Sequence, residues 1–96
     1  MGASEFSIGV KANTAKEAFA IATLEARHDF GHAGYTGTIA EKDGWILIPV
    51  PEGKDPVDFA EDLMETDDPR ISGKWGPAGC VKVKDGEWLF FGWASS

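Results

Sequence analysis

Residues 34–47 read Gly34-Tyr-Thr-Gly-Thr-Ile-Ala-Glu-Lys-Asp-Gly-Trp-Ile-Leu, and residues 76–90 read Gly76-Pro-Ala-Gly-Cys-Val-Lys-Val-Lys-Asp-Gly-Glu-Trp-Leu-Phe. The two stretches share Gly-x-x-Gly, a β-branched residue, Lys-Asp-Gly and a tryptophan, and Glu87 is the single insertion. An Asp-Gly pair between two strand-like runs is typical of a tight β-hairpin. We therefore expect two hairpins, one pairing 38–42 with 45–50 and one pairing 80–84 with 87–94.

Three further elements are predicted around the hairpins. Apolar residues alternate with small or polar ones over 6–12, which is the period of a half-buried strand. Thr14-Ala-Lys-Glu has the spacing of a capping box and predicts a helix over 14–29. Asp55 and the proline that follows it provide a cap and a first turn for a second helix, which ends by Thr66. The predicted order of elements is β-α-ββ-α-ββ.

This order predicts an α+β fold of the two-layer sandwich type, with a mostly antiparallel sheet of four or five strands and both helices on one face. It is a variant of the ferredoxin-like βαββαβ order. We expect a single small domain over 1–96. Residues 1–5 are expected to be disordered or a cloning remnant, and the sequence leaves open whether they are native. The predicted core consists of Phe6, Ile8, Phe19, Ile39, Ile46, Ile48, Phe59, Leu63, Val81, Val83, Trp88 and Phe90.

Composition limits the classes of partner. Sixteen acidic and nine basic residues give a net charge of −7, which disfavours nucleic acid and anionic membranes, because binding to either relies on Lys and Arg. A basic protein surface is the favoured partner. The single cysteine excludes an intrachain disulfide, and the longest apolar run is far shorter than the roughly 20 residues that span a bilayer. We expect a soluble, cytoplasmic protein.

The candidate catalytic and metal-binding residues have structural explanations. His28 and His32 lie about one helical turn apart, but Gly31 should end the helix between them, which removes the facing geometry of a metal site. Cys80 corresponds to Thr38 in the other copy, which indicates a small residue at a strand start rather than a nucleophile. The Gly-x-x-Gly pairs precede strands and indicate close backbone approach rather than phosphate binding. We expect no catalytic residue, metal or cofactor; the sequence favours, without establishing, a protein that is not an enzyme.

Three surfaces are candidates for binding: an open apolar sheet face, an acidic helix face and the loops at the sheet ends. Large exposed apolar patches mark interfaces, acidic surfaces dock on basic partners, and Trp with Arg is typical of binding hot spots. Val83 should face Trp88 and Val81 should face Phe90, whereas Trp45 should point outward. The candidate residues are Trp45, Leu47, Leu89, Phe91 and Trp93 on the sheet, Asp58, Glu61, Asp62 and Glu65 on the helix, and His32, Tyr35, Arg70, Lys74 and Trp75 in the loops.

These surfaces predict a small acidic, non-catalytic domain that binds or inhibits another protein and forms a homodimer through the open sheet face. Phage-encoded inhibitors and immunity proteins resemble it in size and charge. The alternative is a small-molecule-binding or enzymatic domain that uses loop residues at the sheet ends, with His32, Tyr35, Lys74 and Trp75 as contacts. A concave pocket that joins several polar groups would favour this alternative.

Overall fold

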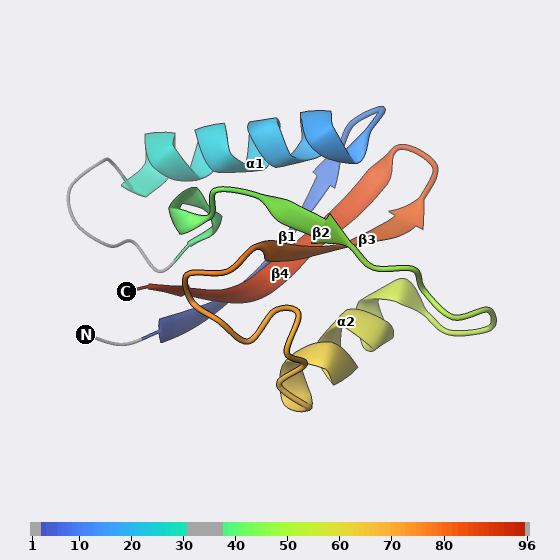
Figure 1. The fold of residues 1–96 in the computed structure, drawn as a ribbon. Coiled ribbons are helices and arrows are strands. Elements are labelled where there is room, and N and C mark those ends of the chain that lie inside the picture. The colour runs from blue at the N-terminus through green and yellow to red at the C-terminus, as the bar shows by residue number, and fades with distance from the viewer. Residues whose placement is uncertain (1–2, 31–37, 96) are drawn as a thin grey trace.

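The computed structural model describes residues 3–30 and 38–95, and it has an α+β fold (Figure 1). The sheet is open and mixed, with strand order β1-β4-β3-β2, and the neighbouring pairs are antiparallel except β3 with β2. The predicted α+β class, with a mostly antiparallel sheet and two helices, is confirmed. The elements are β1 (Ala3–Lys11), α1 (Ala15–Phe30), η1 (Ile39–Glu41), β2 (Trp45–Leu47), α2 (Pro56–Glu65), β3 (Ala78–Lys84) and β4 (Glu87–Ser95).

Both helices begin where their capping residues predict. The Thr14 hydroxyl accepts a hydrogen bond from the Glu17 N–H at 3.1 Å, and the Asp55 carboxylate accepts from the first backbone N–H groups of α2. Such caps satisfy N–H groups that have no partner inside the helix. The alanine face of α1 packs against the sheet, whereas Leu24 lies on the opposite side and is 68% exposed.

The hairpin of β3 and β4 is confirmed, but its register differs from the prediction. Gly86 has φ 77°, as a tight hairpin turn requires, and Lys84 pairs with Glu87 across the turn. A bulge between Lys82 and Lys84 then shifts the pairing by one residue, so that Val81 lies opposite Leu89. The predicted pairs of Val83 with Trp88 and Val81 with Phe90 are therefore wrong, because a bulge places two residues of one strand opposite one of the other.

The first copy of the repeat does not form a hairpin. Residues 39–41 form the 3-10 helix η1, whose cap Thr38 accepts a hydrogen bond from the Ala40 N–H, and β2 pairs in parallel with β3. Gly44 has no positive φ, unlike Gly86. Parallel strands need a crossover connection, and α2 provides it between β2 and β3. The Asp-Gly signal is therefore overridden by tertiary packing in this copy.

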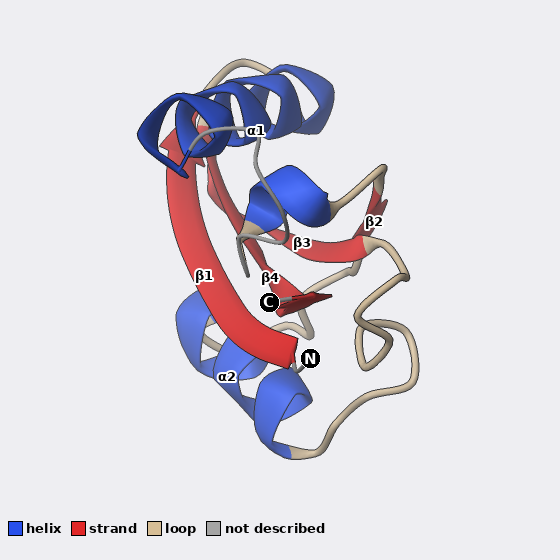
Figure 2. Cartoon of the chain, turned by 90° about the vertical axis from the view of Figure 1, so that its left-hand side faces the viewer, coloured by secondary structure: helices blue, strands red, loops and turns tan. Residues whose placement is uncertain are grey.

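The two helices lie on opposite faces of the sheet, so the prediction that both share one face is wrong (Figures 1 and 2). Side chains alternate between the faces along β4. Trp88 and Phe90 pack with α1, whereas Leu89 and Phe91 pack with α2. Because β4 carries large apolar side chains on both sides, each face needs a cover, and α1 with η1 already occupies the first.

Two buried clusters therefore replace the single predicted core. Ile46, which the sequence placed in the core, is 36% exposed, because it belongs to the short edge strand β2. No helix in the described parts of the chain is long and apolar enough to cross a membrane. The α1 core contains Val10, Ala15, Ala18, Ala22, Ala26, Ile39, Cys80, Trp88 and Phe90, and the α2 core contains Ile48, Ala60, Leu63, Ile71, Val81, Leu89 and Phe91.

Candidate functional site

A groove of about 670 Å³ lies between α2 and β1, on the face of the sheet that α2 partly covers. It exists because α2 packs over β3 and β4, while β1 extends the sheet beyond the helix. The residues that line it come from three elements that are far apart in the sequence. They are Glu5, Phe6 and Ser7 of β1, Val57, Ala60, Glu61, Met64 and Glu65 of α2, and Leu89, Phe91 and Trp93 of β4.

The groove combines an apolar floor with an acidic rim. Leu89 and Phe91 are buried and Trp93 is half-buried, and together they form the β4 side of the groove. Glu5 of β1 and Glu61 and Glu65 of α2 are exposed and form the rim of the groove. Of the described residues that line the groove, none is basic. Such a site suits side chains that have an apolar stem and a positively charged end, as Lys and Arg do.

Trp93 contributes an unsatisfied polar atom to this region. Its indole N–H is buried and has no hydrogen-bond partner among the described residues. Buried donors are rarely left without a partner in folded proteins. The Trp93 indole N–H is therefore a buried donor without an acceptor in the described parts of the fold.

The carboxylates around α2 divide into structural and available groups. Asp55 caps the helix, Asp62 forms an ion pair with Lys54 at 2.6 Å, and Asp68 binds Arg70. For Glu61 and Glu65, which line the groove, the described residues provide no ion-pair partner. Of the four acids that the sequence predicted on this helix, Asp62 is paired with Lys54, Glu61 and Glu65 line the groove, and Asp58 is exposed outside the groove lining.

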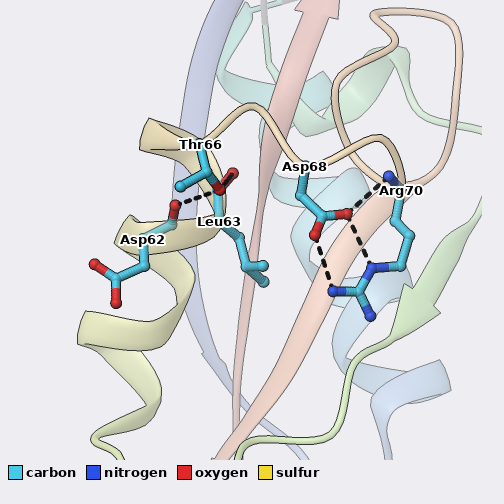
Figure 3. Close-up of polar contacts among 5 residues, drawn as sticks. All are labelled: Asp62, Leu63, Thr66, Asp68 and Arg70. Atoms are coloured by element: carbon cyan, nitrogen blue, oxygen red, sulfur yellow. Dashed lines mark hydrogen bonds and ion pairs between the residues drawn. The ribbon is translucent and has the colours of Figure 1, made fainter.

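Arg70, a predicted binding residue, is already engaged within the fold (Figure 3). Its Nε donates to Asp68 Oδ1 at 2.9 Å and its Nη2 donates to Asp68 Oδ2 at 3.0 Å, while its backbone N–H also donates to Oδ1. These bonds lower the pKa of Asp68 to about 2. The pair lies in the segment that follows α2. At the end of the helix, the Thr66 hydroxyl donates to the Asp62 carbonyl at 2.9 Å. Arg70 therefore has a structural role.

Lys42 is a buried residue that the sequence did not single out. Its side chain is almost fully covered, and its Nζ donates to the carbonyl oxygens of Gly73, Lys74 and Gly76 at 2.9 to 3.3 Å. Burial lowers the pKa of this ammonium. Nothing in the sequence around Lys42 marks it as buried, because its three acceptors lie more than thirty positions later in the chain.

The ammonium of Lys42 holds the loop that presents Lys74 and Trp75. Trp75 is 65% exposed, and the Lys74 Nζ lies 5.6 Å from the centre of its ring. This loop leads into β3 beside β2, at the opposite edge of the sheet from β1. Lys74 and Trp75 therefore lie on a different surface from the groove.

The structure does not bring the predicted sheet residues together on one open face. Leu89 and Phe91 lie under α2, and Trp45 packs against the α1 core instead of pointing outward, because β2 pairs with β3 rather than with residues 38–42. Leu47 is exposed at the β2 edge, whereas Trp93 lines the groove. The predictions for His32 and Tyr35 lie outside the described residues, and the small-molecule alternative that uses them stays a prediction.

Cys80 is fully buried in the α1 core, opposite Phe90. Burial raises the pKa of its thiol to about 12, which keeps the sulfur protonated and unreactive at neutral pH. This burial agrees with the prediction that Cys80 is a small residue at the start of a strand. Over 3–30 and 38–95, no three His, Cys, Asp or Glu side chains are grouped as a metal site would need.

Comparison of the chain with protein-family models, with curated proteins and with solved structures finds no match. Function is therefore inferred from the fold and the groove alone.

Proposed function

We propose that this protein is a non-catalytic binding domain that takes a basic segment of another protein into the groove between α2 and β1. The observation that carries the proposal is the combination of three exposed glutamates, Glu5, Glu61 and Glu65, around an apolar floor. The described lining contains no cation that would neutralise them. The same segment can therefore bury apolar surface and gain charge complementarity.

The net charge of −7 supports the same class of partner. Complementary charge accelerates the encounter of two proteins and selects against partners of the same sign, while burial of apolar surface supplies most of the affinity. A partner whose basic surface normally binds an anion would be blocked by this domain. The proposal thus includes inhibition of such a partner as its functional consequence.

An NMR titration tests the proposal with a defined probe. The probe is the peptide acetyl-Val-Arg-Arg-Val-Arg-Arg-Val-amide, and its counterpart replaces every arginine with glutamate. We expect the basic peptide to shift the backbone amide signals of Glu5, Glu61 and Trp93, and the acidic peptide to shift none of them. Equal binding of both peptides, or shifts confined to the Trp75 loop, would contradict the proposed function.

A further inference from the structure

We infer that the basic segment binds as an added β-strand along the open edge of β1, so that its side chains enter hollows on both faces of the sheet. This inference rests on the proposed function and specifies how the partner is recognised. It assigns the partner an extended conformation with Lys or Arg on both sides of the strand.

The first support is the position of β1 in the sheet. β1 is the terminal strand, and its outer edge has no strand partner within the described part of the chain (Figure 2). It pairs with β4 without a register shift from Ala3 to Lys11. Natural edge strands often carry bulges or prolines that prevent further pairing, and β1 carries neither. The edge is therefore suited to accept another strand.

The hydrogen-bond alternation shows which groups are available. The Ala12 N–H donates to the Gly86 carbonyl at 3.0 Å. In an antiparallel pair, only every second residue exchanges hydrogen bonds with its partner strand, so the bonds to β4 fall on the even-numbered residues of β1. The backbone groups of Glu5, Ser7 and Gly9 therefore point toward the open edge.

Side chains leave this edge accessible. Ser7 is small and Gly9 has no side chain, so neither can cover the edge; the face of the sheet at Gly9 is open as well, since a Cβ added there would meet no atom within 4 Å. Glu5 offers a carboxylate on the same stretch. Another backbone can therefore approach this stretch to hydrogen-bond distance.

The second support is a smaller hollow on the opposite face of β1. It measures about 200 Å³ and lies between β1 and α1, with Phe6, Ile8 and Ala26 as apolar lining and Glu25 and Asp29 as acids. None of the described residues that line it is basic. Among the described residues, the hollows on both faces of this edge therefore have apolar linings with carboxylates and no basic side chain; Lys11, the lysine of β1, lines neither of them.

Two hollows favour a strand over a helix as the bound form. Successive side chains of an added strand point to opposite faces of the sheet, one set toward the groove and the other toward α1. A helix laid in the groove would use only the α2 side. Addition of a strand to a sheet edge is a common form of peptide recognition, in which the backbone gives affinity and alternate side chains give specificity.

Amide hydrogen exchange with the probe peptide tests the mode of binding. We expect the exchange of the Glu5, Ser7 and Gly9 amides to slow by about tenfold or more in the complex, since each would become hydrogen-bonded. A probe with every amide N-methylated keeps its charge and side chains but cannot pair, and it should bind about tenfold more weakly or worse.

A pair of variants at one position provides a matched control. Gly9→Pro removes an amide that points to the open edge, a position where proline is tolerated in edge strands, whereas Gly9→Ala keeps the amide. We expect Gly9→Pro to weaken binding about tenfold and Gly9→Ala to leave it unchanged, with the native amide spectrum verified for both. If Gly9→Pro does not fold, the exchange measurement on the unmodified protein decides.

The results distinguish strand addition at β1 from the proposed binding of a basic segment in the groove. Binding with signal shifts at Glu61 and Trp93, without protection of the β1 amides and with equal affinity for the N-methylated probe, would overturn strand addition and leave the proposed function standing. Absence of binding would overturn both claims. Protection of the β1 amides in the free protein, increasing with its concentration, would show a second copy on the edge and would also overturn the inference.

Discussion

The Lys42 ammonium nitrogen lies 2.9 Å from the Gly76 carbonyl oxygen, which joins the start of the first Lys-Asp-Gly motif to the start of the second repeat. The same nitrogen binds two further carbonyls of the loop. A buried ammonium with three acceptors thus holds residues 73–76 of this loop, while Asp68, Arg70 and the buried Ile71 hold its first part. This contact, rather than a hairpin turn at Asp43-Gly44, links the two copies of the repeat in the structure.

Replacement of Lys42 should therefore destabilise the protein. Lys42→Met keeps the apolar stem but leaves the three carbonyls without their donor, and we expect a loss of about 2 to 3 kcal/mol in the free energy of unfolding. Lys16→Met, at an exposed position on α1, is the control and should change the stability little. Urea denaturation followed by tryptophan fluorescence measures both. Equal midpoints for the two variants would show that the buried contact does not stabilise the loop.

The close contact of Gly79 with Phe91 predicts a second effect. A Cβ at Gly79 would lie 2.7 Å from the Phe91 ring and 2.8 Å from an Ile71 methyl group. Gly79→Ala should cost about 1 to 3 kcal/mol, because the packed core has no room for the added methyl. Gly44→Ala, where a Cβ meets nothing within 4 Å, serves as the control. Phe91→Leu should cost less in the Gly79→Ala background than in the unmodified protein, and additive costs would argue against the clash.

Burial of Cys80 determines its reactivity. Its thiol should react with a chromogenic disulfide reagent only when the protein unfolds, because the sulfur is inaccessible and its pKa is raised to about 12. Cys80→Ser should be less stable than Cys80→Ala by about 1 to 3 kcal/mol, since a hydroxyl in the α1 core would lack a partner. Rapid labelling of the native protein would show that the site is open.

The pair of Asp68 and Arg70 makes a defined contribution to acid stability. The folded pKa of Asp68 is about 2, below the ordinary value of 3.8, so the ionised carboxylate stabilises the folded state. This contribution is complete above pH 3.8 and is lost as the pH falls through about 2. Thermal denaturation between those values should be steeper in pH for the unmodified protein than for Asp68→Asn. Asp43→Asn is the control, and an identical loss of pH dependence in it would refute the assignment.

Local patterns predicted the parts of the fold whose partners are near in sequence. The alternation before Ala12, the cap at Asp55 and the turn at Gly86 each act within a few residues, and α2 and the β3–β4 hairpin form where expected. The strand β1 also forms, but it begins at Ala3, three residues before the alternation predicts, because residues 3–5 pair with the end of β4. Residues 38–47 differ, because Lys42 finds its acceptors more than thirty positions later in the chain and β2 pairs in parallel across α2. No short-range signal contains that information.

The candidate site was only partly predictable, because the residues that line it are distant in the sequence. Glu61, Glu65 and Trp93 were identified from helix charge and aromatic content, but Glu5 and Met64 were not. The groove arises because α2 packs on the second face of the sheet and leaves β1 beside it, and the regular β1–β4 pairing brings Glu5 next to Trp93. The only sign of Glu5 in the sequence is an acid directly before the alternating run 6–12.

The most direct measurement of the central claim is the dissociation constant of the probe peptide, by calorimetry, for two charge-matched variants. The triple variant Glu5→Gln, Glu61→Gln and Glu65→Gln removes the rim of the groove, whereas Glu17→Gln, Asp43→Asn and Glu52→Gln remove the same charge from exposed positions elsewhere. We predict that the first triple variant weakens binding by about tenfold or more and that the second changes it by less than about twofold. Equal weakening by both would show that net charge, and not the groove, attracts the peptide, and would contradict the account.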